Sequence, residues 1–204
     1  MKYLEFRKQF IDLGCFSAHQ VYAVEPAFDR NNLTRWQKQQ LIVKLRQGFY
    51  AFRECIVKPN FAMYLSNFIY KPSYISLHSA LAFYGMIPEA VTQIIAVSSL
   101  KTAEFENDFA LFIYKKIKPE LMFGYLQKPF GERVIRLATP EKALLDLLYL
   151  YPFYNTEEEI ENLRLDDDFI RDELNVTTLI NNAERFNNKA LIQRVKLLKK
   201  IYNI

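Results

Sequence analysis

The stretch DRNNLTRWQKQQLIVKLRQGFYAFR, residues 29–53, combines a helical period with two short alternating runs around a glycine. Asp29 is a suitable N-cap, so the sequence predicts a helix from there to about Gln40. The runs 42–46 and 49–53 flank a Gln-Gly pair, a two-residue turn in which the glycine supplies the positive φ. A helix followed by a β-hairpin is therefore expected.

Two further helices are expected before this stretch. Apolar residues recur at helical spacing over about 3–14, and Gly14 is suited to end that helix. Ser17 can cap a second helix over about 18–24, which Pro26 ends. Three helices followed by a hairpin is the order of a winged helix, in which the third helix enters the major groove of DNA.

The third expected helix has an apolar face and a polar face. Leu33 and Trp36 lie together on a helical wheel and are expected to pack inward. The opposite side carries side chains that can donate to phosphates and read base edges; these are Asn31, Thr34, Arg35, Lys38 and Gln39. A solvent-facing helix can show the same residues by chance.

The expected hairpin also has two faces, because side chains alternate along each strand. Its turn places residue 46 opposite 49 and residue 44 opposite 51. The outer face, which is expected to hold the DNA backbone, then carries Lys44, Arg46 and Arg53. The inner face, which is expected to close a small core, carries Val43, Leu45, Tyr50 and Phe52. The alternative is a winged helix that binds a protein.

The charge distribution favours a polyanionic partner. The net charge is only +4, but residues 30–53 hold six cations and no carboxylate. A basic segment in an otherwise mixed chain is typical of nucleic-acid binding. From charge alone, a solvated face that happens to be basic explains it equally well. Together with the expected helix and hairpin, the charge predicts double-stranded DNA as the partner.

Several classes of site are not supported by the sequence. The five glycines form no Gly-rich nucleotide motif and no nucleophile elbow. Cys15 and His19 share a spacing of one helical turn, but a structural zinc needs four ligands, so neither a metal nor a cofactor is predicted. Asp166-Asp167-Asp168 resembles the acids of a nucleotidyltransferase, yet no glycine is followed by the serine that such an enzyme needs. The sequence therefore predicts no enzyme.

The sequence also predicts a cytoplasmic chain with reduced cysteines and no membrane partner. The N-terminus has no uninterrupted apolar segment of the kind found in signal peptides. The longest apolar stretch, 143–151, is too short to cross a bilayer and contains Asp146. A carboxylate in such a helix is expected to be paired with a neighbouring arginine or a backbone donor rather than to be catalytic.

The second part of the chain is expected to begin at Lys58-Pro59, because the residue before a proline is pushed out of the helical region. Its helices and strands do not alternate regularly, which predicts an α+β fold. Ser76 and Thr139 are expected to cap two of the helices. The expected helices are 60–69, 77–84, 140–151 and 188–202, and the expected strands are 92–98, 101–105, 109–117, 122–127 and 133–137.

Two charged segments lie near the C-terminus. Residues 157–173 carry nine acids, which predicts a solvated surface. The last expected helix is amphipathic, and its basic side carries Lys189, Lys196 and Lys200. This side either keeps the protein soluble, forms a second phosphate-contacting surface or contacts another protein.

Three stretches resemble the AbiEi family of antitoxins, also described as predicted transcriptional regulators of viral defence systems. They are LTRWQKQQLIVKLRQGFYAF (33–52), KPSYISLHSALAFYGMIPEAV (71–91) and ATPEKALLDLLYL (138–150). The resemblance implies an N-terminal winged helix-turn-helix domain (1–58) that binds operator DNA, with inverted repeats, as a repressor of its own operon. It implies a larger mixed α/β antitoxin domain (59–204) without a catalytic site.

The same resemblance implies a functional partner. In such type IV toxin–antitoxin systems, which are linked to abortive infection and phage defence, a neighbouring gene encodes a nucleotidyltransferase-like toxin. A transcriptional regulator that acts alone, without a toxin, would carry the same three stretches.

Overall fold

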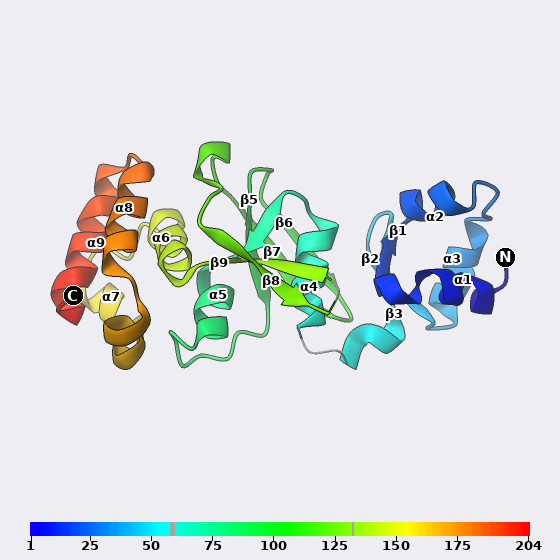
Figure 1. Cartoon of the computed structure of the whole chain (residues 1–204), viewed down its shortest axis with the longest axis horizontal. Coiled ribbons are helices and arrows are strands. Elements are labelled where there is room, and N and C mark those ends of the chain that lie inside the picture. Colours follow the sequence, from blue (N-terminus) through cyan, green and yellow to red (C-terminus); the bar gives the residue numbers. More distant parts are fainter. Residues whose placement is uncertain (58–59, 132) are drawn as a thin grey trace.

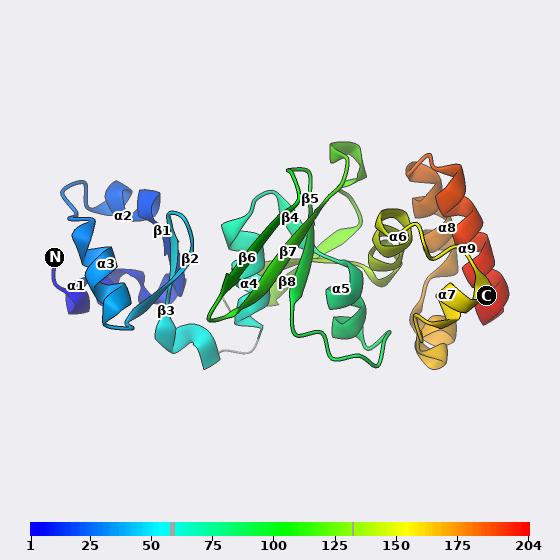
Figure 2. The same cartoon turned by 180° about the vertical axis from the view of Figure 1, so that it is seen from behind.

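Figure 1 shows a computed structural model of the chain, which describes residues 1–57, 60–131 and 133–204. The fold is mixed α+β, as predicted. Residues 1–57 lie at one end of an elongated molecule, a β-sheet lies in the middle, and the C-terminal helices lie at the other end (Figure 1). The predicted junction Lys58-Pro59 lies outside the described residues. Figure 2 shows the same arrangement from behind, with the two termini far apart.

The first 57 residues contain the three predicted helices and the predicted hairpin. A short strand that the sequence did not indicate, β1, pairs with β3, so that the strand order is β1-β3-β2. Ser17 caps the second helix as predicted, because its Oγ accepts a hydrogen bond from the Gln20 N–H at 3.2 Å. Asp29 Oδ1 accepts from the Asn31 N–H at 2.9 Å, but the N-cap residue of the third helix is Arg30, so the prediction of Asp29 as N-cap is wrong by one position. The elements are α1 (Tyr3–Phe10), β1 (Cys15–Ser17), α2 (Ala18–Val24), α3 (Asn31–Lys38), β2 (Ile42–Arg46) and β3 (Phe49–Phe52).

The hairpin has the predicted residue pair next to its turn, but the pairs farther from the turn are shifted by one residue. Arg46 lies opposite Phe49 as expected, but Lys44 lies opposite Tyr50. A β-bulge between Lys44 and Arg46 causes the shift, because it adds one residue to β2 that has no partner on β3. That residue is Leu45, and its carbonyl accepts a hydrogen bond from Asn107 Nδ2 at 3.3 Å. A contact with a distant part of the chain thus accompanies the bulge.

Aromatic rings fill the core of residues 1–57. Phe6 lies at its centre, with ring centroids 4.7 Å from Phe10, 4.7 Å from Trp36 and 5.0 Å from Phe16. All four side chains are buried. Rings at these separations add to the free energy of burial, so the short helices are held by tertiary packing rather than by their length.

The central sheet has the order β6-β7-β5-β4-β9-β8 among the described residues. Two of its pairs, β5 with β7 and β4 with β9, are parallel, and its other neighbours are antiparallel. This mixture agrees with the predicted absence of a regular doubly wound sheet. The strands are β4 (Ser73–Ile75), β5 (Ile94–Ser98), β6 (Ala103–Asn107), β7 (Ala110–Lys116), β8 (Tyr125–Phe130) and β9 (Arg133–Ala138).

Helices cover both faces of this sheet. Alternate residues of β5 join different clusters: Ala96 packs with Leu65 of α4 (Phe61–Ile69), whereas Ile95 and Val97 pack on the other side. That second side is covered by α5 (Leu77–Tyr84) and α6 (Pro140–Leu150), and Thr139 caps α6 as predicted. The last helices pack beyond α6 and are α7 (Glu157–Glu161), α8 (Val176–Arg185) and α9 (Lys189–Tyr202).

No helix in the described ranges has the length and apolar character needed to cross a bilayer.

A buried polar cluster joins the sheet to α6. Asp146 has no exposed surface, and its Oδ2 accepts hydrogen bonds from Tyr74 and Ser76, each at 2.8 Å. Its Oδ1 contacts Nζ of Lys142, one helical turn earlier and equally buried. The expectation of an arginine or backbone partner for Asp146 is therefore wrong, and so is the prediction that the Ser76 side chain caps α5. The Ser76 hydroxyl is engaged by the carboxylate instead.

Burial shifts the pKa values of both charged groups in the cluster. Burial raises the pKa of Asp146, and the ammonium and two hydroxyls that face it oppose that shift. Burial lowers the pKa of Lys142, and Asp146 opposes that shift. The ammonium also lies 4.5 Å from the ring centroid of Phe186 and 4.7 Å from that of Phe123.

Candidate nucleic-acid interface

The two faces of α3 are arranged as the sequence predicts. Leu33 and Trp36 are buried against the aromatic core, and α1 supports them through an edge-on contact between Tyr3 and Trp36, with ring centroids 5.4 Å apart. All the side chains predicted to meet DNA on this helix are exposed, namely Asn31, Thr34, Arg35, Lys38 and Gln39. This helix lies in the end of the molecule that is farthest from the C-terminal helices (Figures 1 and 2).

The charges on α3 are not neutralised by a carboxylate of the described residues. Arg35 Nη2 donates to Asn32 Oδ1 at 2.7 Å, and Asn32 is mostly buried, so this contact orients the guanidinium. In the part of the chain that the structure describes, Arg30, Arg35 and Lys38 form no ion pair with a carboxylate. Unpaired cations beside exposed amide and hydroxyl groups are suited to phosphate oxygens and base edges.

The hairpin cations do not join this face. Arg46 turns toward the central sheet, where its Nη1 donates to the Ile69 carbonyl at 3.0 Å. Its guanidinium carbon lies 5.0 Å from the ring centroid of Phe49, 5.1 Å from that of Phe105 and 5.6 Å from that of Tyr70. The prediction that Arg46 lies on an open outer face is therefore wrong.

The other two hairpin cations also face the central sheet. Arg53 Nη1 lies 2.6 Å from Asp108 Oδ2 in an exposed ion pair, so the prediction that the Arg53 charge is left for the DNA backbone is wrong as well. Lys44 is exposed, but it lines a groove of about 680 Å³ between β2 and β6, together with Glu104 and Glu106. The edge strand β6 packs beside β2 on the hairpin side that the sequence assigned to DNA, while Lys44 stays exposed.

Residues 1–57 are closely packed on the central body. The rings of Phe49 and Phe68 meet edge-on, with centroids 5.6 Å apart. Gly14 has φ +66°, and a Cβ there would lie 2.9 Å from Cε2 of Phe61. One hydrophobic cluster contains residues from both parts, which explains why the hairpin cations serve as contacts within the chain.

This placement of Arg46 gives a testable stability difference. Arg46→Ala is expected to lower the free energy of unfolding by about 2 kcal/mol, because it removes a charged hydrogen bond and three ring contacts. Arg53→Ala removes an exposed ion pair and is expected to cost less than about 1 kcal/mol. Urea unfolding followed by circular dichroism measures both, and equal losses would contradict the role given to Arg46.

The possible second basic surface lies at the other end of the molecule. Lys189, Lys196 and Lys200 are exposed on α9, as predicted, and α9 is remote from α3 (Figure 1). Lys200 forms an ion pair with Glu157 of the adjoining α7. The nine acids of 157–173 are exposed or, for Glu159, partly exposed, which agrees with a solvated surface. This end of the molecule is therefore mixed in charge.

The two residues considered for a metal lie in different elements. Cys15 is buried in β1, where burial raises the pKa of its thiol to about 12, whereas His19 is exposed on α2. Within the described ranges, no three His, Cys, Asp or Glu side chains gather as a metal site would require.

In comparisons with known proteins, the chain matches no protein-family model and no curated protein. The exposed face of α3 and the three stretches described above therefore support the function proposed below.

Proposed function

We propose that residues 1–57 act as a winged helix that binds double-stranded DNA through α3, and that the protein represses its own operon. The observation that carries this proposal is the exposed face of α3, which presents its polar residues outward while Leu33 and Trp36 are buried. A helix that presents donors from one face at the end of a molecule fits the major groove.

The placement of the hairpin changes how we expect the protein to dock. Arg46 and Arg53 are engaged with the central body, so they contribute little to the DNA backbone. Lys44 is the exposed cation among the three predicted on the hairpin, and Gln47 is exposed at the turn. We therefore expect binding to be centred on α3, with a weak salt dependence for a winged helix because few phosphates are contacted.

We further propose that the remainder of the chain is an antitoxin whose toxin is nucleotidyltransferase-like. This part rests on the resemblance of 71–91 and 138–150 to the AbiEi family. The structure supports it in one respect: Tyr74 and Ser76 of the first stretch meet Lys142 and Asp146 of the second in the buried cluster. Two stretches that are far apart in the chain thus form one structural unit.

DNA binding through α3 predicts different effects for different side chains. Asn31→Ala is expected to weaken binding to the operator by about 1–3 kcal/mol and to leave binding to a random duplex unchanged, because a base contact is lost. Lys38→Gln is expected to weaken binding to both duplexes alike and to reduce the salt slope by about one phosphate. Fluorescence anisotropy with the upstream region of the operon measures these affinities.

Lys118→Gln is the matched control, because it removes the same charge from an exposed position outside residues 1–57. It is expected to leave both affinities unchanged. Equal losses on operator and random DNA for every α3 variant would overturn the assignment of base contacts. Absence of binding to either duplex would favour the alternative, a protein-binding module.

The antitoxin proposal has its own test, which is independent of DNA binding. Co-expression with the product of the neighbouring gene is expected to restore growth that this product alone arrests. If the neighbouring gene encodes no toxic protein, the antitoxin proposal fails, and a stand-alone regulator remains.

A further inference from the structure

A basic groove lies between α4 and the β8–β9 hairpin, away from α3. Its volume is about 320 Å³, and its lining contains the cations Lys71, Arg133 and Arg136. Among the described residues that line it, none carries a carboxylate. Three cations that converge on a small groove, with no carboxylate in its described lining, produce a positive potential, which favours an anionic ligand.

The strands and the helix position these cations. Arg136 lies directly opposite Gln127 in the antiparallel β8–β9 pair, so both side chains emerge on one face of the hairpin. The Arg136 guanidinium also bonds to the Asn67 carbonyl at 3.4 Å. The Arg133 guanidinium carbon lies 4.9 Å from the Tyr64 ring centroid, which restricts its position. The groove is therefore preorganised rather than formed by chance surface lysines.

Asn67 adds a buried donor that lacks an acceptor. It belongs to the lining of the groove and is only 4% exposed. Its Oδ1 accepts a hydrogen bond from the backbone N–H of Arg136 at 2.6 Å. This contact fixes the orientation of the side-chain amide, so Nδ2 is the donor that still needs an acceptor. In the described residues, Nδ2 has no hydrogen-bond partner. A buried donor without an acceptor is costly, and an acceptor-rich ligand would remove that cost.

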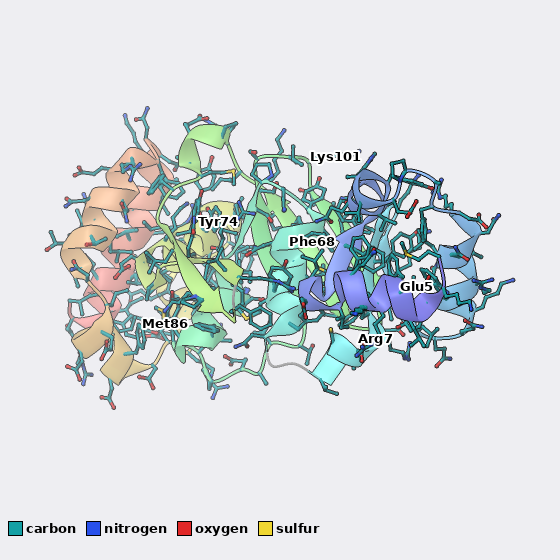
Figure 3. All side chains as sticks on the ribbon, turned by 45° about the vertical axis from the view of Figure 1, so that its right-hand side comes forward. Glu5, Arg7, Phe68, Tyr74, Met86 and Lys101 are labelled. Atoms are coloured by element: carbon teal, nitrogen blue, oxygen red, sulfur yellow. The ribbon has the colours of Figure 1, made fainter. Side chains whose placement is uncertain are left out.

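A second cavity continues the groove toward residues 1–57. It has a volume of about 390 Å³ and shares Phe68 and Lys71 with the first. Figure 3 labels Phe68, which lies on α4 near the boundary between the two parts of the chain. The second cavity adds Arg46, and its described lining again lacks a carboxylate. A ligand that carries more than one phosphate could thus follow both cavities.

We propose that the groove formed by Asn67, Lys71, Arg133 and Arg136 binds a phosphate group, supplied either by a free phosphate ester or by the DNA backbone. Guanidinium groups bind phosphate with paired, charge-assisted hydrogen bonds, and the lysine adds a point charge. The site is separate from α3, so it goes beyond the function proposed above.

The test uses the full chain and two probes. Inorganic pyrophosphate, titrated by calorimetry, represents the free phosphate, and a random-sequence duplex in anisotropy assays represents the backbone. Lys71→Gln and Arg136→Gln are the variants, and Lys118→Gln is the control because it removes an exposed cation outside the groove. Thermal melts monitored by circular dichroism check that each variant is folded. If Arg136→Gln is unfolded, Lys71→Gln alone provides the test, because Lys71 is exposed.

We expect Lys71→Gln and Arg136→Gln each to weaken the binding of pyrophosphate or of the duplex about tenfold. Lys118→Gln is expected to bind both probes as the unmodified protein does. Weaker pyrophosphate binding identifies a free phosphate ester, and weaker duplex binding alone identifies the DNA backbone. If neither probe is affected more than in Lys118→Gln, the proposal is overturned. A failure of operator recognition by α3 would leave the pyrophosphate result intact, so the two proposals fail separately.

Discussion

Asp146→Ala is expected to lower the free energy of unfolding by about 3–5 kcal/mol. The substitution leaves the Lys142 ammonium buried without its partner and leaves the hydroxyls of Tyr74 and Ser76 without an acceptor. Urea unfolding, monitored by circular dichroism, measures the loss. Asp167→Ala is the matched control, because Asp167 pairs with Arg171 across the same helical spacing but both side chains are more than half exposed. The control is expected to cost about 0.5 kcal/mol or less.

The same variant has an expected pH dependence. Burial lowers the pKa of Lys142 in the folded protein below the usual lysine value of 10.5, and removing Asp146 removes the main opposing charge. The unfolded chain then binds more protons than the folded chain at pH values between the folded-state pKa and 10.5. The stability of Asp146→Ala is therefore expected to rise with pH across that window. A double variant, Lys142→Met with Asp146→Leu, is expected to lose less stability than Asp146→Ala, because no charge is left buried.

A loss for Asp146→Ala no larger than that of Asp167→Ala would show that the buried cluster does not hold the sheet to α6.

Trp36→Ala is expected to destabilise the protein by about 3–5 kcal/mol and to abolish DNA binding at temperatures where residues 1–57 unfold. Trp36 is 1% exposed and contacts Tyr3, Phe6 and Phe28 through its ring. Its removal leaves a cavity on the side of α3 that faces the core. Circular dichroism is the suitable measurement, because the chain contains only one tryptophan and the variant has no tryptophan fluorescence.

Leu4→Ala on α1 is the control for this prediction. Leu4 is apolar but 76% exposed, so its truncation is expected to change the free energy of unfolding by less than about 0.5 kcal/mol. If Trp36→Ala kept both its stability and its operator binding, the packing of α3 on the aromatic core would not be what orients its polar face.

Local patterns in the sequence were sufficient for most helices and for the two faces of α3. Ser17 and Thr139 mark the starts of helices through hydrogen bonds to nearby residues, so their effects can be predicted without the fold. The spacing of Leu33 and Trp36 likewise predicts which side of α3 is buried. The prediction does not depend on which residues form the core that this side packs against.

Contacts between distant residues decided the rest. The sequence predicts a turn at Gln47-Gly48, but the bulge at Leu45 and the inward course of Arg46 depend on β6 and α4, which come later in the chain. Similarly, Ser76 is a suitable cap by local rules, and only the approach of Asp146 gives its hydroxyl a different partner.

The physical reason is the range of the interactions involved. Caps, turns and helical periodicity act over a few residues, whereas the partner of a charge depends on which surfaces pack together. Cations on an amphipathic strand satisfy the same alternation whether they face water, DNA or another part of the chain. In this protein the packing of residues 1–57 on the central sheet gave Arg46 and Arg53 partners within the chain and left the polar face of α3 exposed.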